Sequence, residues 1–487
     1  VPPSAGPQVR VSATVAGSQA SRRSFNSTGA LPPLDTNGPR PVSDNWPVTA
    51  VAWSTQAGGS GEAAEVFLTL AYDEVLAIQY FGVDLPPYWR RFGEDGFALV
   101  ANATLQYAQL MERIRDTDQT LTEALTTAGG AQYSEVASLV YRQAFGGCKL
   151  VWNEKRSTPW YFLKEISSCS CLSTMDVTFP MSPVVLYENP ALLYLMLEPV
   201  LAYGNNETDI PYNLPWTPHH LGTYPIANLP PSKQENMPVE ETANLMLMLA
   251  GIAQSLGNVS FVSHYWPLLE QYAQYLNTTA LDPGDQLCTD DFEGPSPHNA
   301  NLAAKGIMGL AAYAQLWHLA GNDSQAKVWM EQAQSYAPQW AQRAADGDHY
   351  RLEYDKAHTW SLKYNLVWQD VLGLPVFDPA IIAEEISYYM THQHLEYGVP
   401  LDVRATFTKA DWLSWIAAMA PDDVFATLVG DLHAFANATP QRVPFTDWYQ
   451  ADSADQKGFR CRPVMGAVFA KMIVGGGGSG RGAGGRV

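Results

Sequence analysis

The chain has 487 residues, of which 46% are hydrophobic and 16% are charged. It can therefore bury a large core and has material for a second, smaller module. Lysine and arginine number 29 against 49 aspartate and glutamate, which gives a net charge of −20. So acidic a chain repels phosphate backbones and anionic headgroups, which argues against nucleic acid and membrane surfaces as partners. The longest apolar run, Leu245 to Ala253, falls short of the roughly 20 residues that a membrane-spanning helix needs.

Potential glycosylation sites are more numerous than chance supplies. About two to three Asn-x-Ser/Thr sequons are expected in a chain of this composition. The sequence has seven, beginning at Asn26, Asn102, Asn206, Asn258, Asn277, Asn322 and Asn437. We therefore expect a secreted glycoprotein, and because the chain begins at Val1 we expect a processed product or a fragment. Five cysteines are too few for a disulfide-held scaffold, and their odd number leaves at least one free thiol.

The N-terminal part of the chain has the alternating pattern of β-strands. Strands are predicted over Val9 to Val15, Pro47 to Trp53 and Glu65 to Gly82, with breaks rich in Gly, Pro and Ser between them. Three or four strands make a poor sandwich by themselves. We interpret residues 1–90 as the C-terminal part of a β-sandwich-like domain whose beginning is missing.

From Gly93 onward the hydrophobic period is helical. About eleven helices are predicted, over Asp95–Ala128, Tyr133–Trp152, Asn189–Tyr203, Glu240–Leu256, Phe261–Leu276, Asn299–Leu319, Asp323–Ala345, Pro379–His392, Lys409–Met419, Asp422–Ala436 and Pro463–Ile473.

The helices alternate in character along the chain. The segments Leu245 to Ala253 and Leu302 to Tyr313 are apolar on nearly every side, whereas residues 323–345 carry a single apolar stripe. Buried and half-exposed helices in turn predict a mainly α fold, an (α/α)6 toroid of six hairpins over residues 91–474. A solenoid is the alternative, but no repeat of fixed period is present. The Gly-rich tail, residues 475–487, is predicted to be disordered.

Two pairs of adjacent carboxylates precede or open all-apolar helices. Asp290 and Asp291 lie just before the helix that begins near Asn299, and Glu240 and Glu241 open the helix of Leu245 to Ala253. Helix starts favour acidic side chains electrostatically, so capping alone is one explanation of both pairs. The other is catalytic, because neighbouring carboxylates at one rim have pKa values pushed apart, which separates acid from base roles.

Tryptophan lies beside or near aspartate in Asp411-Trp412, Asp447-Trp448 and Trp368-Gln-Asp370. Sugar-binding clefts use this pairing, although an aromatic core residue beside a helix cap produces it too. His219-His220, His298 and Asp348-His349 could offer metal ligands, but their spacing matches no zinc or calcium loop, so neither a metal nor a cofactor is predicted. Cys288 with His298 could form a thiol nucleophile pair; a lone cysteine is more often structural.

Eleven strings in the same order resemble the glutaminase A family of extracellular proteins, from about residue 40 to residue 474. They are Asp44-Asn-Trp-Pro47, Leu70-Ala-Tyr-Asp-Glu74, Gln79-Tyr-Phe-Gly82, Met175-Asp-Val-Thr-Phe-Pro180, Gly222-Thr-Tyr-Pro225, Met237-Pro-Val-Glu-Glu241, Leu287-Cys-Thr-Asp-Asp-Phe292, His298-Asn-Ala-Asn-Leu302, Gly347-Asp-His-Tyr-Arg-Leu352, Lys363-Tyr-Asn-Leu-Val-Trp368 and Arg442-Val-Pro-x-x-Asp-Trp-Tyr449. The resemblance implies an N-terminal β-domain, a C-terminal six-helical-hairpin domain, and extracellular hydrolysis of L-glutamine to L-glutamate and ammonia.

On chemical grounds we expect Asp290 or Asp291 to be the general base, with Glu240 or Glu241 and Asp447 as partners. Expected substrate-binding residues are His298, Asn299, Asp348, His349, Lys363, Tyr364, Asp176, Trp412 and Trp448. Two alternatives stay open: a glycoside hydrolase that uses two carboxylates across the cavity, and a non-catalytic carbohydrate-binding relative.

Overall fold

The structure is a computed structural model that describes residues 9–55, 66–93, 95–442 and 444–474. The chain divides into two compact units, residues 1–71 and 72–487. In the first unit, β1 (Val9–Gly17) pairs antiparallel with β2 (Pro47–Thr55), and α1 (Ser18–Thr28) follows β1 directly. This small sheet agrees with the two strands predicted there, whereas α1 was not predicted.

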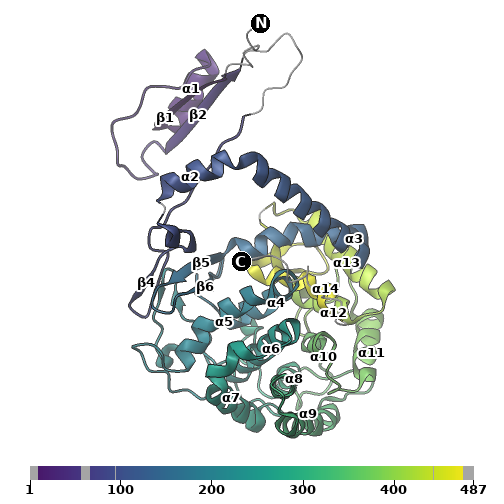
Figure 1. Cartoon of the computed structure of the whole chain (residues 1–487). Coiled ribbons are helices and arrows are strands. Elements are labelled where there is room, and N and C mark those ends of the chain that lie inside the picture. The colour runs from purple at the N-terminus through teal and green to yellow at the C-terminus, as the bar shows by residue number, and fades with distance from the viewer. Residues whose placement is uncertain (1–8, 56–65, 94, 443, 475–487) are drawn as a thin grey trace. The chain divides into compact units, whose positions relative to one another are not determined.

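The second unit contains every other described element (Figure 1). In chain order these are β3 Ile78–Tyr80, β4 Val83–Leu85, η1 Tyr88–Phe92, α2 Gly96–Leu105, α3 Tyr107–Gly146, β5 Cys148–Asn153, β6 Thr158–Leu163, α4 Met175–Glu188, α5 Pro190–Gly204, β7 Gly222–Thr223, β8 Ile226–Ala227, η2 Pro231–Lys233, α6 Pro238–Leu256, η3 Ser260–Tyr265, α7 Trp266–Thr279, η4 Asp291–Glu293, α8 Ala300–Leu319, α9 Asp323–Ala344, η5 Tyr364–Leu366, α10 Val367–Leu372, α11 Pro379–Tyr388, η6 Tyr389–Gln393, β9 Phe407–Lys409, α12 Ala410–Met419, α13 Asp422–Ala438, β10 Thr446–Gln450, β11 Gln456–Arg460, η7 Pro463–Phe469 and α14 Ala470–Ile473.

An inner ring of helices forms the centre of this unit. Around the ring, α4 packs on α6, α6 on α8, α8 on η5 and α10, α10 on α12, and α12 on η7 and α14, which return to α4. Outer helices α3, α5, α7, α9, α11 and α13 surround it, as Figure 1 shows. In α6 and α8 the side chains are buried on every side, while α9 buries one stripe. The predicted six-hairpin toroid is confirmed.

Two inner helices, α4 and the short α10, were not predicted from the sequence, and α4 is the longer of them. It contains Pro180 and Pro183, and proline inside a helix removes a hydrogen bond and normally disfavours the structure. Here every residue from Met175 to Leu186 is buried, so tertiary packing outweighs the local preference. The contact with η7 is especially close, because a Cβ atom added at Gly466 would lie 2.7 Å from the carbonyl oxygen of Met181.

Several helix and strand boundaries differ from those predicted from the sequence. The strand expected over 65–82 is reduced to β3; Glu65 itself lies outside the described residues, as does the tail at 475–487. The long helix α3 is interrupted at Gly130, where φ is 82°, at the break predicted between two helices. The segment expected to continue that helix to Trp152 instead forms β5, which pairs with β6. Among the described residues, no helix is long and apolar enough to cross a bilayer.

A buried ion pair joins two inner helices. The Lys305 ammonium of α8 contacts the Glu240 carboxylate of α6, and both side chains are almost fully buried. We predict that Lys305→Met lowers the free energy of unfolding by about 3–5 kcal/mol, because it leaves a buried carboxylate without a partner. The double variant K305M/E240Q should recover much of that loss. Chemical denaturation measures both.

Lys327→Met is the matched control, since the Lys327 pair with Glu331 is exposed and such pairs contribute about 0–1 kcal/mol. Equal destabilisation by the two single substitutions would contradict the interpretation of the buried pair.

Candidate active site

Side-chain contacts show that the starts of the inner helices lie at one end of the ring. Asn365, in η5, donates to the Asn301 carbonyl near the start of α8, with N and O 3.2 Å apart. Tyr364 of η5 stacks on Trp412 of α12 with ring centroids 4.2 Å apart. Because helix N-termini favour anions, this end is the natural place for the carboxylates predicted from the sequence.

Asp176, His219 and Glu241 form a buried group at the starts of α4 and α6. His219 Nδ1 contacts Glu241 Oε1 and lies 3.8 Å from Asp176 Oδ1. Burial raises the pKa of both carboxyls, and their mutual repulsion raises the pKa of Asp176 further. Burial opposes the charge on His219, but the two carboxylates outweigh it and raise its pKa. We denote these three residues the acidic triad.

Asp291 borders the acidic triad and is open to solvent. Its side chain is exposed, yet desolvation by surrounding protein raises its pKa, against the opposing charge of Arg462. Glu235 and His219 also act on it electrostatically. Because its side chain is exposed, Asp291 can contact a small molecule from solution.

Asp290, the preceding residue, faces the interior instead. Tyr364 donates its hydroxyl hydrogen to Asp290 Oδ2 at 2.9 Å. Oδ1 of Asp290 has no hydrogen-bond partner among the described residues. Burial raises the pKa of Asp290 to about 7, so a large fraction of this carboxyl is protonated near neutral pH. Asp290 and Asp291 therefore differ in exposure and in bonding partners.

Two buried cations balance a second group of carboxylates. Lys409 Nζ contacts Asp447 Oδ2 and lies 3.1 Å from Asp411 Oδ2, while Arg462 Nη1 lies 3.7 Å from Asp447 Oδ2. Burial raises the pKa of Asp411 to about 6. Arg462 also interacts with Asp176, so it connects this group to the acidic triad.

An aromatic cluster flanks the charged groups. Trp448, on β10, lies 4.6 Å from Phe292, 5.1 Å from Phe459 and 5.4 Å from Phe407, measured between ring centroids. Phe292 directly follows Asp291, and Trp448 pairs with Lys409 across β10 and β9. The site therefore has an apolar wall beside its carboxylates.

The structure brings together many of the predicted site residues through these linked contacts: Asp176, Glu241, Asp290, Asp291, Tyr364, Trp412, Asp447 and Trp448. The other predicted residues have partners of their own. Glu240 pairs with Lys305, and Lys363 Nζ donates to the carbonyls of Tyr350 and Ser361.

His298 pairs with Asp282, and Asn299 caps α8 by accepting from Leu302 N. The pair Asp348 and His349 lies beside Tyr388, on which the His349 ring stacks at 4.1 Å. These four residues were expected to bind substrate, and within the described part of the chain they contact side chains outside the acidic triad and away from Asp290.

Lys409, Arg462 and the pairing of His219 with carboxylates were missed by sequence reasoning. Lys409 begins one predicted helix and Arg462 directly precedes another, and basic residues at such boundaries are commonly exposed to solvent. The available signal was indirect: with so many carboxylates expected at one buried rim, some of the 29 basic residues had to be buried beside them.

Among the residues that the structure describes, two groups of side chains have the composition of metal ligands. One is the acidic triad; the other is Glu165 with Cys169 and Cys171. Cys169 and Cys171 form a disulfide, which removes their thiolates, and Cys148, Cys288 and Cys461 are free. Burial raises the pKa of Cys288 well above its ordinary value, so its thiol keeps its proton and is a poor nucleophile.

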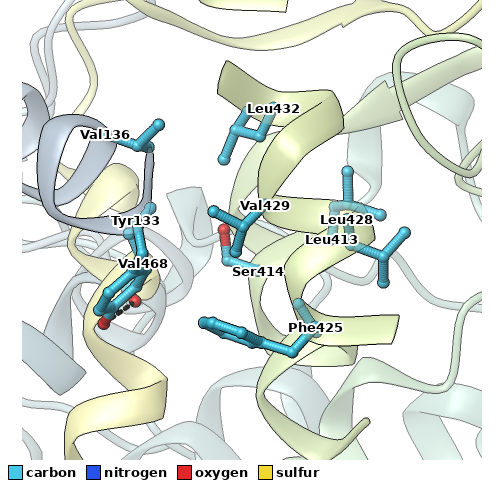
Figure 2. A pocket seen from close by; sticks show the side chains of 10 residues that line it. Tyr133, Val136, Leu413, Ser414, Phe425, Leu428, Val429, Leu432 and Val468 are labelled. Atoms are coloured by element: carbon cyan, nitrogen blue, oxygen red, sulfur yellow. Dashed lines mark hydrogen bonds between the residues drawn. The ribbon is translucent and has the colours of Figure 1, made fainter. Parts of the chain in front are cut away.

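Cavities elsewhere in the described part of the chain are separate from these charged groups. Figure 2 shows one between α3, α12 and α13, lined by Tyr133, Val136, Leu413, Phe425 and Leu432 among others. Its volume of about 10 Å³ barely admits one water molecule. A wider groove of about 640 Å³ lies beside α11, lined by Asp370, Ile382, Met390 and neighbouring residues.

The helical ring, with its charged end, defines a toroidal six-hairpin protein. Residues 130–472 match the sequence model of the glutaminase A six helical-hairpin domain, and residues 4–124 match a domain of unknown function, DUF5127. The chain belongs to the glutaminase A six-hairpin family, which confirms the resemblance seen in the sequence.

Two curated relatives match nearly the whole of this chain. Glutaminase A of Aspergillus oryzae is 32% identical over 467 residues, which is 93% of this chain and 66% of that protein. A probable glutaminase of Arthroderma benhamiae is 25% identical over 93% of this chain and 64% of its own length. The chain thus spans slightly less than two thirds of the length of these relatives.

Among solved structures, a bacterial glucoamylase complexed with acarbose superposes with a TM-score of 0.51 and 9% identity. The match covers 97% of this chain and 72% of the glucoamylase. At that identity the likeness concerns the fold alone.

The raised pKa of Asp290 predicts a pH-dependent effect on stability. Its pKa rises from 3.8 to about 7 on folding, so between those values the native state holds a proton that the unfolded state has lost, and rising pH removes stability. Asp290→Asn resembles the neutral form. We predict that it gains stability relative to wild type as pH rises from 4 to 8, by up to about 4 kcal/mol at about 1.4 kcal/mol per pKa unit.

Urea denaturation at pH 4.5 and pH 8 tests this. Asp452→Asn, at an exposed position, is the control and should follow wild type at both values. A difference between D290N and wild type that stays constant with pH would contradict the assignment.

Proposed function

We propose that the chain is a hydrolase that cleaves the side-chain amide of L-glutamine to L-glutamate and ammonia. The observation that carries this proposal is the contrast between two adjacent carboxyls at the ring end. Asp291 is open to solvent beside Arg462, and Asp290 is buried with a pKa of about 7. One can act as a base and the other as an acid at one pH.

In the proposed reaction Asp291 removes a proton from a water molecule as the water oxygen bonds to the amide carbon. Asp290 gives its proton to the nitrogen as the C–N bond breaks, so that ammonia leaves and a carboxyl group forms. Asp291 then loses its proton to solvent and Asp290 takes one up, which restores the starting state of both carboxyls. No covalent intermediate with the protein is needed.

Cations near these carboxyls suit an amino-acid substrate. Arg462 interacts with Asp291, and Arg404 interacts with Asp290 while forming a bidentate pair with Asp402. A guanidinium binds a carboxylate with two parallel hydrogen bonds. We therefore assign recognition of the substrate α-carboxylate to Arg462, the arginine whose charge acts on the proposed base Asp291.

The names of the curated relatives support the amide substrate. Both are called glutaminases, one of them as probable. The second candidate function is hydrolysis of a glycosidic bond, and one observation favours it: Trp448 is partly exposed among the aromatic residues beside Asp291. An aromatic face of this kind stacks on the C–H faces of sugars.

We also propose that the protein acts outside the cell. The asparagines of the seven sequons are all exposed or partly exposed in the structure, so each could carry a glycan without disturbing the core. This supports the secretory route inferred from their number.

Asp291→Asn tests the proposed function. We predict that it lowers kcat for ammonia release from glutamine by about 10²–10⁴-fold, the usual contribution of a general base, with little change in Tm because the side chain is exposed. Glu293→Gln is the matched control: it removes a carboxylate from the same short helix and should retain activity within a few-fold.

Ammonia release is measured beside reducing-sugar release from a panel of glycans. Sugar release without ammonia release would replace the amide substrate by a glycosidic one. Activity on neither substrate would favour a non-catalytic relative, and full activity of D291N would refute the base.

A further inference from the structure

We propose that the acidic triad is a binding site for one divalent cation of the Zn²⁺ or Mn²⁺ type. The three residues come from two helix starts and the segment between them: Asp176 from α4, Glu241 from α6, and His219. The proposal concerns binding and stands apart from the identity of the substrate, because it rests only on the geometry of these side chains.

The ligand atoms of the triad are close enough for one ion. A carboxylate oxygen of Asp176, a carboxylate oxygen of Glu241 and a ring nitrogen of His219 all lie within 4.8 Å of one another, and all three residues are buried. Zinc binds such atoms at about 2.0–2.2 Å, which places ligand atoms about 3–4 Å apart. The 3.8 Å between His219 Nδ1 and Asp176 Oδ1 fits that requirement. His219 Nδ1 and Glu241 Oε1 are in direct hydrogen-bond contact, so these two atoms must separate and release the proton between them when the ion binds.

Asp176 supplies an independent reason to expect a ligand. Its side chain is 7% exposed, and its Oδ1 has no hydrogen-bond partner among the described residues. A buried carboxylate oxygen without a partner is costly, and in native proteins such atoms usually bind a donor, a water molecule or an ion. This oxygen lies 3.8 Å from His219 Nδ1, so it belongs to the triad.

The elements that carry the triad are fixed to one another. Met175 N donates to the His219 carbonyl at 2.9 Å, and Thr217 N donates to the Thr242 hydroxyl at 3.2 Å. These hydrogen bonds attach the His219 segment to the first turns of α4 and α6. A site whose ligands are held in place before binding loses little conformational entropy when the ion arrives.

Neighbouring side chains orient the ligands as outer-shell residues do in metal proteins. Asn244 Nδ2 donates to Glu241 Oε2 at 2.9 Å, which leaves Glu241 Oε1 directed at His219. On the far side of the imidazole ring, His219 Nε2 lies 3.7 Å from Glu235. That distance is too long for a hydrogen bond, so the half-exposed Glu235 acts on the ring through its charge and does not fix its orientation.

The charge and ligand types select the class of cation. Two carboxylates with nearby Asp291 and Glu235 outnumber the single arginine, Arg462, that acts on the triad. One nitrogen and two oxygens suit Zn²⁺ or Mn²⁺, whereas Ca²⁺ takes six to eight oxygens. Three protein ligands leave at least one coordination position for water or a small molecule.

Isothermal titration of the full chain, first stripped with a chelator, tests the proposal with ZnCl₂ and MnCl₂ and without substrate. We expect one ion per chain. Asp176→Asn should weaken binding by at least about 100-fold, because loss of an inner ligand exceeds the 10–100-fold cost of losing an outer one. Glu235→Gln removes the same charge next to His219 without removing a ligand, and should change affinity only a few-fold.

Thermal unfolding separates a ligand role from a purely structural one. Without metal, D176N should be at least as stable as wild type, because it relieves repulsion between two buried carboxyls. With added metal, Tm should rise for wild type and not for D176N. Absence of binding at millimolar metal, or equal binding by D176N and wild type, would overturn the site. Neither measurement depends on glutamine hydrolysis. A negative result for the metal site can therefore be distinguished from a negative result for the proposed glutaminase activity.

Discussion

Each inner helix of the toroid starts at the same end of the ring, so the unpaired N–H groups of several helix starts face one small region. That region attracts negative charge, and Asp176, Glu241 and Asp411 all lie in first turns there. The dipoles alone do not balance so many buried carboxylates. Lys409 and Arg462 complete the balance, and the ring is the scaffold that holds them all in reach.

This arrangement separates carboxyls by environment more than by sequence position. Asp290 and Asp291 are neighbours in the chain, but one is hydrogen-bonded to Tyr364 inside the ring and the other is open beside Arg462. Glu240 and Glu241 differ in the same way, since one pairs with Lys305 and the other with His219. Because the two acids of each pair have different partners, adjacent carboxyls can take different roles.

Much of the fold could be predicted because it depends on hydrophobic periodicity. Helices α6, α8 and α9 were located within a few residues, and their alternation between buried and one-faced gave the ring. Helix α4 was missed because Pro180 and Pro183 contradict a helix locally, and only contacts from η7 and α6 outweigh them. At the candidate site Asp290, Asp291 and Glu241 were selected by their positions at helix starts, whereas Arg462 and His219 act through partners distant in sequence. No local pattern encodes such pairings. His298 and His349, which were expected to bind substrate, contact Asp282 and Tyr388 in the structure.

The close contact between Gly466 and Met181 closes the ring, and it joins the last helical turns of the chain to the first inner helix. Asp176 and Arg462 are therefore brought together only by that closure. A chain cut before Arg462 would therefore keep all three residues of the acidic triad but lack the guanidinium whose charge acts on Asp176.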